Sequence, residues 1–256
     1  MRAILFTAAC CVLLCGNLSS QSRILGFRNL RFGSVSSTTH NHPASALVFE
    51  TFDSTGYDLV GWTEVLTGAG GVVNEDYTTN VLSGTQSLFI KIPDDENGYV
   101  TNSFTATGTA YGYFQFRPIS FATGEDQWKS VFRFEDSSGN SLCKVQIQES
   151  GFLRVTTGST SSSLLSVVSV NTTYHVWVYW KNSNGTDSEC SLAVSTTQVK
   201  PTSGDYFTSA TGTATGTQTS RVRLGGGNDS EDAAAGGCSF VLDYVLVDDD
   251  EIQSYP

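Results

Sequence analysis

The chain has 256 residues, a formal net charge of -11 at pH 7 and a sequence pI near 4.6. This balance argues against nucleic acid as a partner, because phosphates require a basic footprint, and it equally argues against adsorption to anionic lipid. Neutral glycans, cell-surface polymers and calcium remain as partner classes.

The first 22 residues have the pattern of a secretory signal peptide. Arg2 precedes an apolar stretch from Ala3 to Leu14, and Ser20 and Ser22 follow in the spacing of a cleavage site. The apolar stretch is too short to span a bilayer, and no later stretch reaches the ~20 apolar residues that a membrane helix needs. We therefore expect a secreted, extracellular protein, or a periplasmic or cell-surface protein in a bacterial host, without a transmembrane segment.

Residues 23–46 follow as a linker or loosely attached arm, since they combine three arginines with a Ser/Thr tract and have little periodicity. The remainder, 47–256, is long enough to form one domain with a sizeable core. After removal of the signal peptide the cysteines are Cys143, Cys190 and Cys238. An odd number allows at most one internal disulfide, and the sequence leaves the pairing open.

From residue 47 onward, apolar and polar residues alternate with a period of two, which is typical of half-buried strands. The expected strands are 88–92, 111–117, 128–135, 142–149, 152–155, 164–170, 174–181, 190–194, 222–224 and 239–247. The Thr-rich segment 208–219 is either an extended surface loop or an edge strand, and we expect the loop. Because no window has the apolar stripe of a helix, the sequence predicts an all-β sandwich.

Four segments carry a family resemblance: ALVFETFDSTGYDLVGWTEV, VLSGTQSLFIKI, TTYHVWVYWKN and FVLDYVLVDDDEI. Together they resemble the concanavalin A-like lectin/glucanase superfamily, in its laminin-G-like jelly-roll branch, and they extend from Ala46 to Ile252. The resemblance implies a two-sheet antiparallel jelly-roll sandwich whose first and last strands are neighbours. It also implies binding or degradation of extracellular glycans.

The same resemblance implies a structural calcium ion held by Glu50 and Asp243, with Asp53 or Asp248 as a further ligand. Asp243 stands in an apolar strand, between Val241 and Val245 on its own face. Burying its carboxylate without compensation is costly, and a hard dication with oxygen ligands would compensate it. The alternative is that Asp243 accepts backbone N–H bonds at a corner of the sheet.

A second set of side chains alternates with the apolar core positions and combines rings, amides and cations. We expect these side chains to share one sheet face and to bind ligand: Tyr111, Tyr113, Arg117, Arg133, Gln146, Gln148, His175, Trp177 and Tyr179. Rings stack on pyranose C–H faces, whereas amides and cations bond hydroxyls or carboxylates. The pattern predicts a glycan groove, and the alternative is an ordinary solvated sheet face.

Catalytic residues are not assigned. No strand carries the Glu-x-Asp-x-x-Glu pattern of the retaining glycoside hydrolases in this superfamily. The strand 144–148, KVQIQ, resembles the Gln-Ile-His strand of jelly-roll polysaccharide lyases, but Gln148 stands where histidine is expected. His175 with Tyr179 could supply that function instead. We therefore expect a non-catalytic glycan-binding or surface-interaction module, with a polysaccharide lyase or glycoside hydrolase, or a purely structural exoprotein, as the alternatives.

Overall fold

The computed structural model is an all-β protein, as predicted. It describes residues 46–53, 61–68, 70–93, 96–121, 128–148, 150–166, 168–183, 187–204, 206–213, 218–226 and 237–252. The predicted signal peptide and nearly all of the predicted arm lie outside these ranges. None of the described residues forms a helix that is long and apolar enough to cross a membrane.

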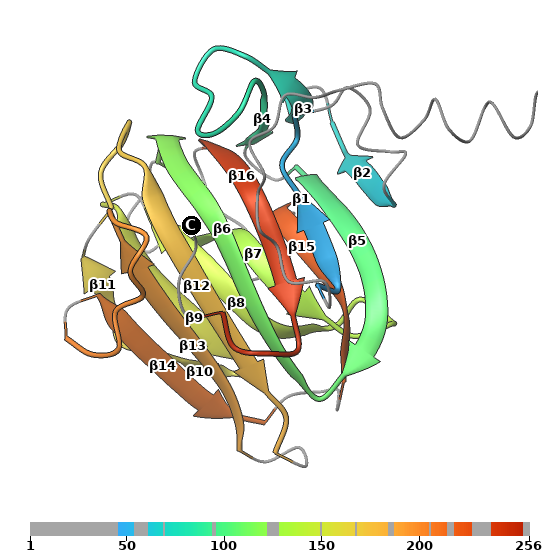
Figure 1. Ribbon diagram of the computed structural model, residues 1–256, viewed down its shortest axis with the longest axis vertical. Coiled ribbons are helices and arrows are strands. Elements are labelled where there is room, and N and C mark those ends of the chain that lie inside the picture. Colours follow the sequence, from blue (N-terminus) through green and yellow to red (C-terminus); the bar gives the residue numbers. More distant parts are fainter. Residues whose placement is uncertain are drawn as a thin grey trace, which may run out of the picture. The chain divides into compact units, whose positions relative to one another are not determined.

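The strands form two antiparallel sheets (Figure 1). The first, sheet A, has the order β14-β13-β12-β6-β16-β4-β3, and β1 pairs with β16. Its strands are β1 Val48–Glu50, β3 Val72–Tyr77, β4 Ser87–Ile92, β6 Thr109–Ser120, β12 Tyr174–Lys181, β13 Ser188–Ser195, β14 Phe207–Gly212 and β16 Cys238–Asp248. The first and last strands are therefore neighbours, as the resemblance implied.

The second, sheet B, has the order β10-β9-β8-β7-β15-β5-β2, and β11 pairs with β9. Its strands are β2 Trp62–Leu66, β5 Gly98–Thr107, β7 Trp128–Glu135, β8 Ser141–Gln148, β9 Phe152–Thr157, β10 Thr160–Ser161, β11 Leu165–Ser166 and β15 Thr219–Gly226. The β5–β6 connection passes from sheet B to sheet A, so these two consecutive strands belong to different layers.

The hydrophobic core lies between the two sheets. Phe114 of β6 stacks on Phe132 of β7, with ring centroids 5.1 Å apart and an interplanar angle of 8°. Gly112 gives these rings room, because a Cβ there would lie 2.8 Å from Phe132. A disulfide between Cys143 of β8 and Cys190 of β13 links the layers through the core.

Several strand predictions need correction. The expected strand 164–170 is limited to β11, and the chain turns at Asn171, whose φ is 61°. Residues 207–212 form the edge strand β14 instead of the expected loop, because Thr208 and Ala210 pack inward against the sandwich. The alternation of apolar and polar residues did not predict β1, β2, β3 and β5. The predicted strands 128–135 and 174–181 have the predicted bounds.

Strand β16 contains a bulge that changes which residues share a face. Asp243 pairs with Gln115, but the next paired residue on the same side is Leu246, opposite Tyr113. Tyr244 has a φ of 50° within this bulge. Val245 therefore points into the core, and its predicted position on the face of Asp243 is wrong.

Candidate functional site

The residues predicted to form one ligand face lie on two sheets. Sheet A carries Tyr111, Tyr113, Arg117, His175, Trp177 and Tyr179, and sheet B carries Arg133, Gln146 and Gln148. Both groups alternate with core residues and point away from the core. The prediction of a single groove is therefore wrong, because alternation identifies the face of a strand but not the sheet that the strand joins.

On sheet A, two of the predicted ligand residues are packing residues. Tyr113 is 1% exposed and Trp177 is 2% exposed, and both belong to a small hydrophobic cluster that includes Tyr244 and Ile252. The Tyr113 hydroxyl forms a hydrogen bond of 2.6 Å with Nδ1 of His175, and burial lowers the pKa of that histidine. Neither aromatic side chain is accessible to a polymer.

The other sheet A residues differ in their surroundings. Arg117 donates from Nε and Nη2 to the hydroxyl of Thr173, at 2.9 and 2.7 Å. Tyr111 and Tyr179 are half-buried, with ring centroids 4.9 Å apart. Both tyrosines line one pocket on this sheet.

The outer face of sheet B carries a concentration of positive charge. The cations lie on β7, β8, β9 and β15 and are Arg133, Lys144, Arg154, Arg221 and Arg223. They are five of the ten Lys and Arg residues that follow residue 45 in an otherwise acidic chain. Arg133 was predicted as a ligand residue from the sequence, whereas the three arginines of β9 and β15 were not. The alternation in RVRL, residues 221–224, was the available signal.

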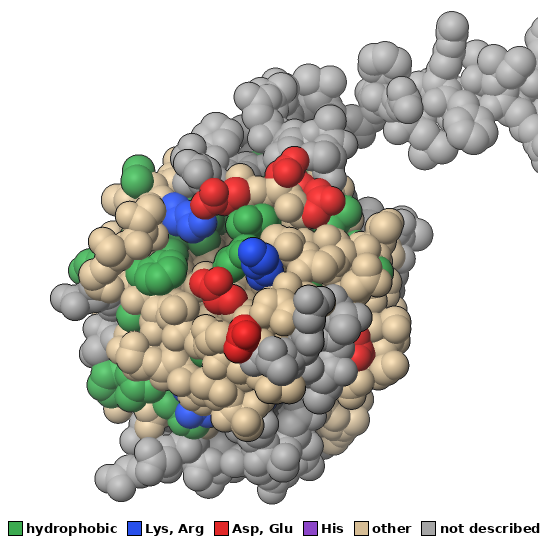
Figure 2. All heavy atoms as spheres, turned by 90° about the horizontal axis from the view of Figure 1, so that it is seen from below, with side chains coloured by type: hydrophobic (Ala, Val, Ile, Leu, Met, Phe, Trp, Pro, Cys, Tyr) green, Lys and Arg blue, Asp and Glu red, His purple; other side chains and the backbone are tan. Residues whose placement is uncertain are grey.

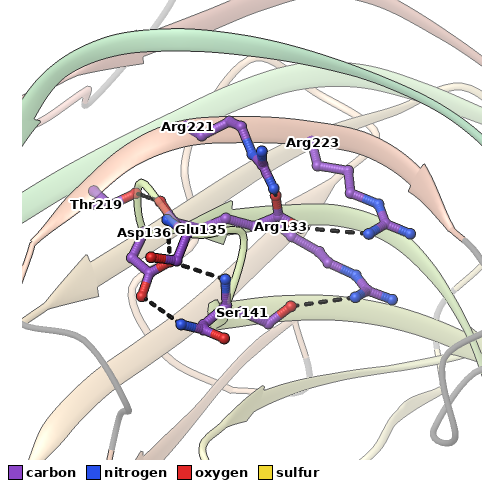
Figure 3. Close-up of polar contacts among 9 residues, drawn as sticks. Arg133, Glu135, Asp136, Ser141, Thr219, Arg221 and Arg223 are labelled. Carbon is purple, nitrogen blue, oxygen red and sulfur yellow. Dashed lines mark hydrogen bonds and ion pairs between the residues drawn. The ribbon is translucent and has the colours of Figure 1, made fainter. Parts of the chain in front are cut away.

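Glu135 holds two of these arginines in place (Figure 3). It is fully buried, and its Oε2 accepts from Arg221 Nε at 2.7 Å, while Arg223 Nη1 lies 3.4 Å from Oε1. Arg133, on the same strand, donates from Nη1 to the Ser141 hydroxyl at 3.2 Å. Charge-assisted contacts of this kind fix the direction of a guanidinium group. The face is therefore an ordered array of cations.

Amide and aromatic groups lie among the cations. Gln146 is buried, and its Oε1 accepts from Arg154 Nε at 3.0 Å and from the Thr156 hydroxyl at 3.3 Å. The guanidinium carbon of Arg154 lies 3.9 Å from the ring centroid of Trp128. Arg223 lies over Tyr99 of β5 in the same way, at 3.6 Å. The face thus combines cations with aromatic rings. Neither the two arginines nor the two rings of these pairs were predicted from the sequence.

The two predicted metal ligands are buried carboxylates. Asp243 accepts from Ser83 N at 2.9 Å, Ser87 Oγ at 2.8 Å and Tyr244 N at 2.7 Å. Burial nevertheless raises the pKa of Asp243 to about 8, and burial also raises the pKa of Glu50. Asp243 therefore accepts backbone N–H bonds. This is the role that the sequence offered as the alternative to calcium binding.

Asp53 interacts electrostatically with both Asp243 and Glu50. Its negative charge contributes to the raised pKa of both Asp243 and Glu50. Its Oδ1 accepts from Thr85 N at 2.5 Å, and Gly84 has a φ of 62° with no room for a Cβ beside the Asp53 carboxylate. Carboxylates are hard oxygen donors of the type that calcium prefers. Among the described residues, however, the acidic group whose ligand atoms lie within 4.8 Å of one another is Asp248, Asp249 and Asp250, and not the predicted pair Glu50 and Asp243. Asp248, the other suggested ligand, is five residues from Asp243 along β16, or about 16 Å.

This arrangement has clear chemical capabilities. Arg154, Arg221 and the amide of Gln148 are half-buried and can contact an anionic polymer that also carries hydroxyl groups. The other cations of the face and Gln146 are buried, so they act on such a polymer through their charge or by positioning their neighbours. Proton abstraction needs a base, and among the described residues His175 lies on sheet A, away from the cations. Gln148, the residue at the histidine position of the lyase-like strand, cannot accept a proton from carbon at neutral pH.

Comparisons with known proteins agree with the fold. A scan against protein-family models and a search of curated proteins both find no match. Similar solved structures include an endo-beta-1,4-glucuronan lyase from the fungus Trichoderma reesei, which is 13% identical to this chain. The match covers 82% of this chain and 98% of the lyase chain, with a TM-score of 0.55. The cellulose induced protein Cip1 is 14% identical, with coverages of 80% and 99% and a TM-score of 0.53.

A third similar structure is the marine PL-14 alginate lyase from Aplysia kurodai. It is 10% identical, with coverages of 80% and 99% and a TM-score of 0.52. At identities this low the likeness concerns the fold. The fold is a two-sheet antiparallel jelly-roll sandwich, as predicted.

Proposed function

We propose that this chain is an exported protein that binds an acidic, uronate-containing polysaccharide along the outer face of sheet B. The main observation in support is that five of the ten Lys and Arg residues after residue 45 lie on the outer face of sheet B, on four neighbouring strands. Buried cations such as Arg133 and Lys144 contribute a positive potential that salt screens weakly. The half-buried Arg154 and Arg221 reach outward to contact carboxylates.

The rings support the same proposal. Trp128 and Tyr99 lie under Arg154 and Arg223, so each guanidinium is held flat and its N–H groups remain directed sideways. A uronate offers a carboxylate to such a group and hydroxyls to neighbouring amides. Glucuronan and alginate, the polymers in the names of two similar structures, are polyuronates, which agrees with this charge requirement.

Polysaccharide lyase activity is the second candidate. A lyase neutralises the uronate carboxylate with Arg or Gln while a base removes the neighbouring C–H proton, and the glycosidic C–O bond breaks as a double bond forms. Gln146, Arg154 and Tyr99 lie on the same face and favour this reading. Binding without cleavage is preferred, because the lyase-like strand has Gln148 in place of a histidine base.

Affinity electrophoresis of the mature chain in gels containing alginate, glucuronan or neutral glucan tests the proposal. We expect retardation by the polyuronates that weakens as salt rises, and at least a tenfold weaker affinity in Arg154→Ala, since a charge-assisted hydrogen bond contributes about 1.5–3 kcal/mol. Lys91→Ala makes the same change of charge on sheet A and serves as the control. Equal retardation of both variants, or none of the wild type, would overturn the proposal.

The same samples separate binding from cleavage. Unsaturated uronides absorb in the ultraviolet, so a lyase produces a rising absorbance and a shorter polymer. A binder changes neither quantity. Loss of any such activity in Tyr99→Phe, with binding retained, would identify Tyr99 as the base of a lyase.

A structural calcium ion is a separate proposal. The candidates to hold it are Glu50, Asp53 and Asp243, because the charge of Asp53 acts on both of the other carboxyl groups. When bound, the ion would neutralise buried carboxylates that otherwise favour their protonated form. Its role would be to stabilise the pairing of the first and last strands, since Glu50 lies on β1 and Asp243 on β16.

A further inference from the structure

A pocket of about 270 Å³ opens on the outer face of sheet A, whose strands do not carry the cation array. Its floor is a row of side chains on neighbouring strands, because Tyr179 of β12 pairs with Tyr111 of β6 on one side and with Ser191 of β13 on the other. The remaining lining residues are Lys200, Pro201, Thr202, Phe207 and Glu251.

An ion pair joins two walls of the pocket. Lys200 follows β13, and its Nζ lies 2.9 Å from Oε1 of Glu251, which follows β16. Figure 1 shows the chain after β16 turning back across β6 toward β12. The pocket is therefore built by three separate parts of the chain: the sheet, the segment before β14 and the C-terminal segment.

The lining has the chemical composition of a sugar subsite. The Tyr111 and Tyr179 rings, with centroids 4.9 Å apart and inclined by 35°, form an aromatic floor beside Phe207. Ser191 and Thr202 add hydroxyl groups that both donate and accept. Aromatic faces flanked by a few polar groups suit a pyranose ring, and the volume is close to the lower limit of about 300 Å³ for ligand pockets.

The charge around the pocket differs from that on sheet B. Burial raises the pKa of Tyr179 to about 12, and negative charge on Glu189 and Glu251 contributes to that rise. The pKa of Tyr111 is raised by burial and by Glu251, Asp250 and Glu189. The tyrosine hydroxyls thus stay protonated as donors, and the acidic surroundings repel a carboxylate. Figure 2 shows acidic side chains in red, with basic ones in blue among them, over the end of the molecule that is seen from below.

We propose that this pocket binds a single neutral sugar residue of a glycan, with the ring stacked on Tyr111 and Tyr179 and its hydroxyls bonded by Ser191, Lys200 and Glu251. The site is independent of the proposed polyuronate site and lies on the other sheet. One chain would then hold a neutral glycan through sheet A and an acidic one through sheet B, and so join two polymers.

Protection of Lys200 from acetylation tests this assignment in the folded wild-type chain. The probes are cellohexaose, laminarihexaose and mannohexaose as neutral oligosaccharides, and an alginate hexasaccharide as the acidic one. We expect at least one neutral probe to slow acetylation of Lys200, read by mass spectrometry, while Lys91 reacts at an unchanged rate. Protection by no neutral probe, or equal protection by the alginate hexasaccharide, overturns the proposal.

Variants separate this site from the one on sheet B. Calorimetric titration should give at least tenfold weaker binding of the protecting neutral probe to Tyr179→Ala, and unchanged binding to Arg154→Ala. Tyr179→Phe keeps the ring and should retain most of the affinity, which guards against a loss caused by misfolding. A neutral probe that binds Tyr179→Ala as well as wild type would contradict the pocket as its site, whatever the result of the polyuronate experiment.

Discussion

Arg221 and Glu135 face each other across the neighbouring strands β15 and β7, and the guanidinium Nε lies 2.7 Å from the carboxylate. The Glu135 side chain is fully buried, whereas that of Arg221 is 30% exposed. One buried carboxylate therefore anchors a cation that still reaches the surface. Arg223, two residues along the same strand, shares this anchor at 3.4 Å.

Removing the charge of Glu135 should loosen this array. Glu135→Gln keeps the shape but deprives two arginines of their carboxylate, so we expect the free energy of unfolding to fall by about 2 kcal/mol, in the range for charged hydrogen bonds. Urea denaturation measures this loss. Glu64→Gln, at an exposed position of β2 in the same sheet, is the matched control and should change stability little. Equal stability of the two variants would contradict the anchoring role.

The polyuronate affinity of Glu135→Gln is a second measurement of the anchoring role. Glu135 is a positioning residue, because it acts through Arg221 and Arg223. Glu135→Gln should weaken binding severalfold although it makes the face more positive. A gain in affinity would show that net charge matters more than orientation.

The buried carboxyl of Asp243 should make stability depend on pH. Its pKa rises from about 3.8 in the unfolded chain to about 8 in the folded one, so the protonated form is favoured on folding. This contribution is fully present below pH 4 and is lost as pH rises through 8. In the presence of chelator, the free energy of unfolding of wild type should therefore decline across this window relative to Asp243→Asn. Parallel pH profiles of the two proteins would contradict this.

Calcium should reverse that decline if it binds at Asp243. An ion that binds only the native state stabilises it by mass action, by about 2.7 kcal/mol at a hundred times its Kd. We expect calcium to raise the melting temperature of the chelated protein near pH 8, and to have no such effect on Asp243→Asn. Asp249→Asn tests the rival site, because the ligand atoms of Asp248, Asp249 and Asp250 lie within 4.8 Å of one another. It should respond like wild type, and loss of its response would place the ion there instead. An unchanged melting temperature in wild type would exclude the site.

The disulfide between Cys143 and Cys190 should contribute strongly to stability. Its sequence separation of 47 residues corresponds to a loop-closure contribution of about 4 kcal/mol. The double variant Cys143→Ala, Cys190→Ala should lose stability on that scale, by denaturant titration. Cys238 keeps its thiol, so the denatured, unreduced mature chain should titrate one thiol. Three titrated thiols would contradict the pairing.

The sequence was sufficient for the fold class but not for the assembly of the site. Alternation of Phe132 and Phe134 with Arg133 correctly assigned core and outer faces on β7. It could not separate Arg133 from Tyr113, because sheet membership depends on long-range pairing that a local period does not encode. The bulge at Tyr244 is likewise invisible to a strict period of two, so Val245 was assigned to the wrong face.

Burial on the outer face was equally hidden. Tyr113 and Trp177 have the composition of a sugar platform, but Ile252, far along the chain, packs in the cluster that seals them. Thr208–Gly212 resembles a loop in composition and became a strand only through pairing with β13. Tertiary contacts decided both outcomes against the local pattern.

The pairing of Val48 with Val247 has a consequence for biosynthesis. Because β1 and β16 are far apart in the sequence, β16 emerges from the ribosome long after β1. Sheet A therefore cannot close until β16 has emerged, and contacts of such long range are slow to form. Until then, β1 lacks the strand with which it pairs.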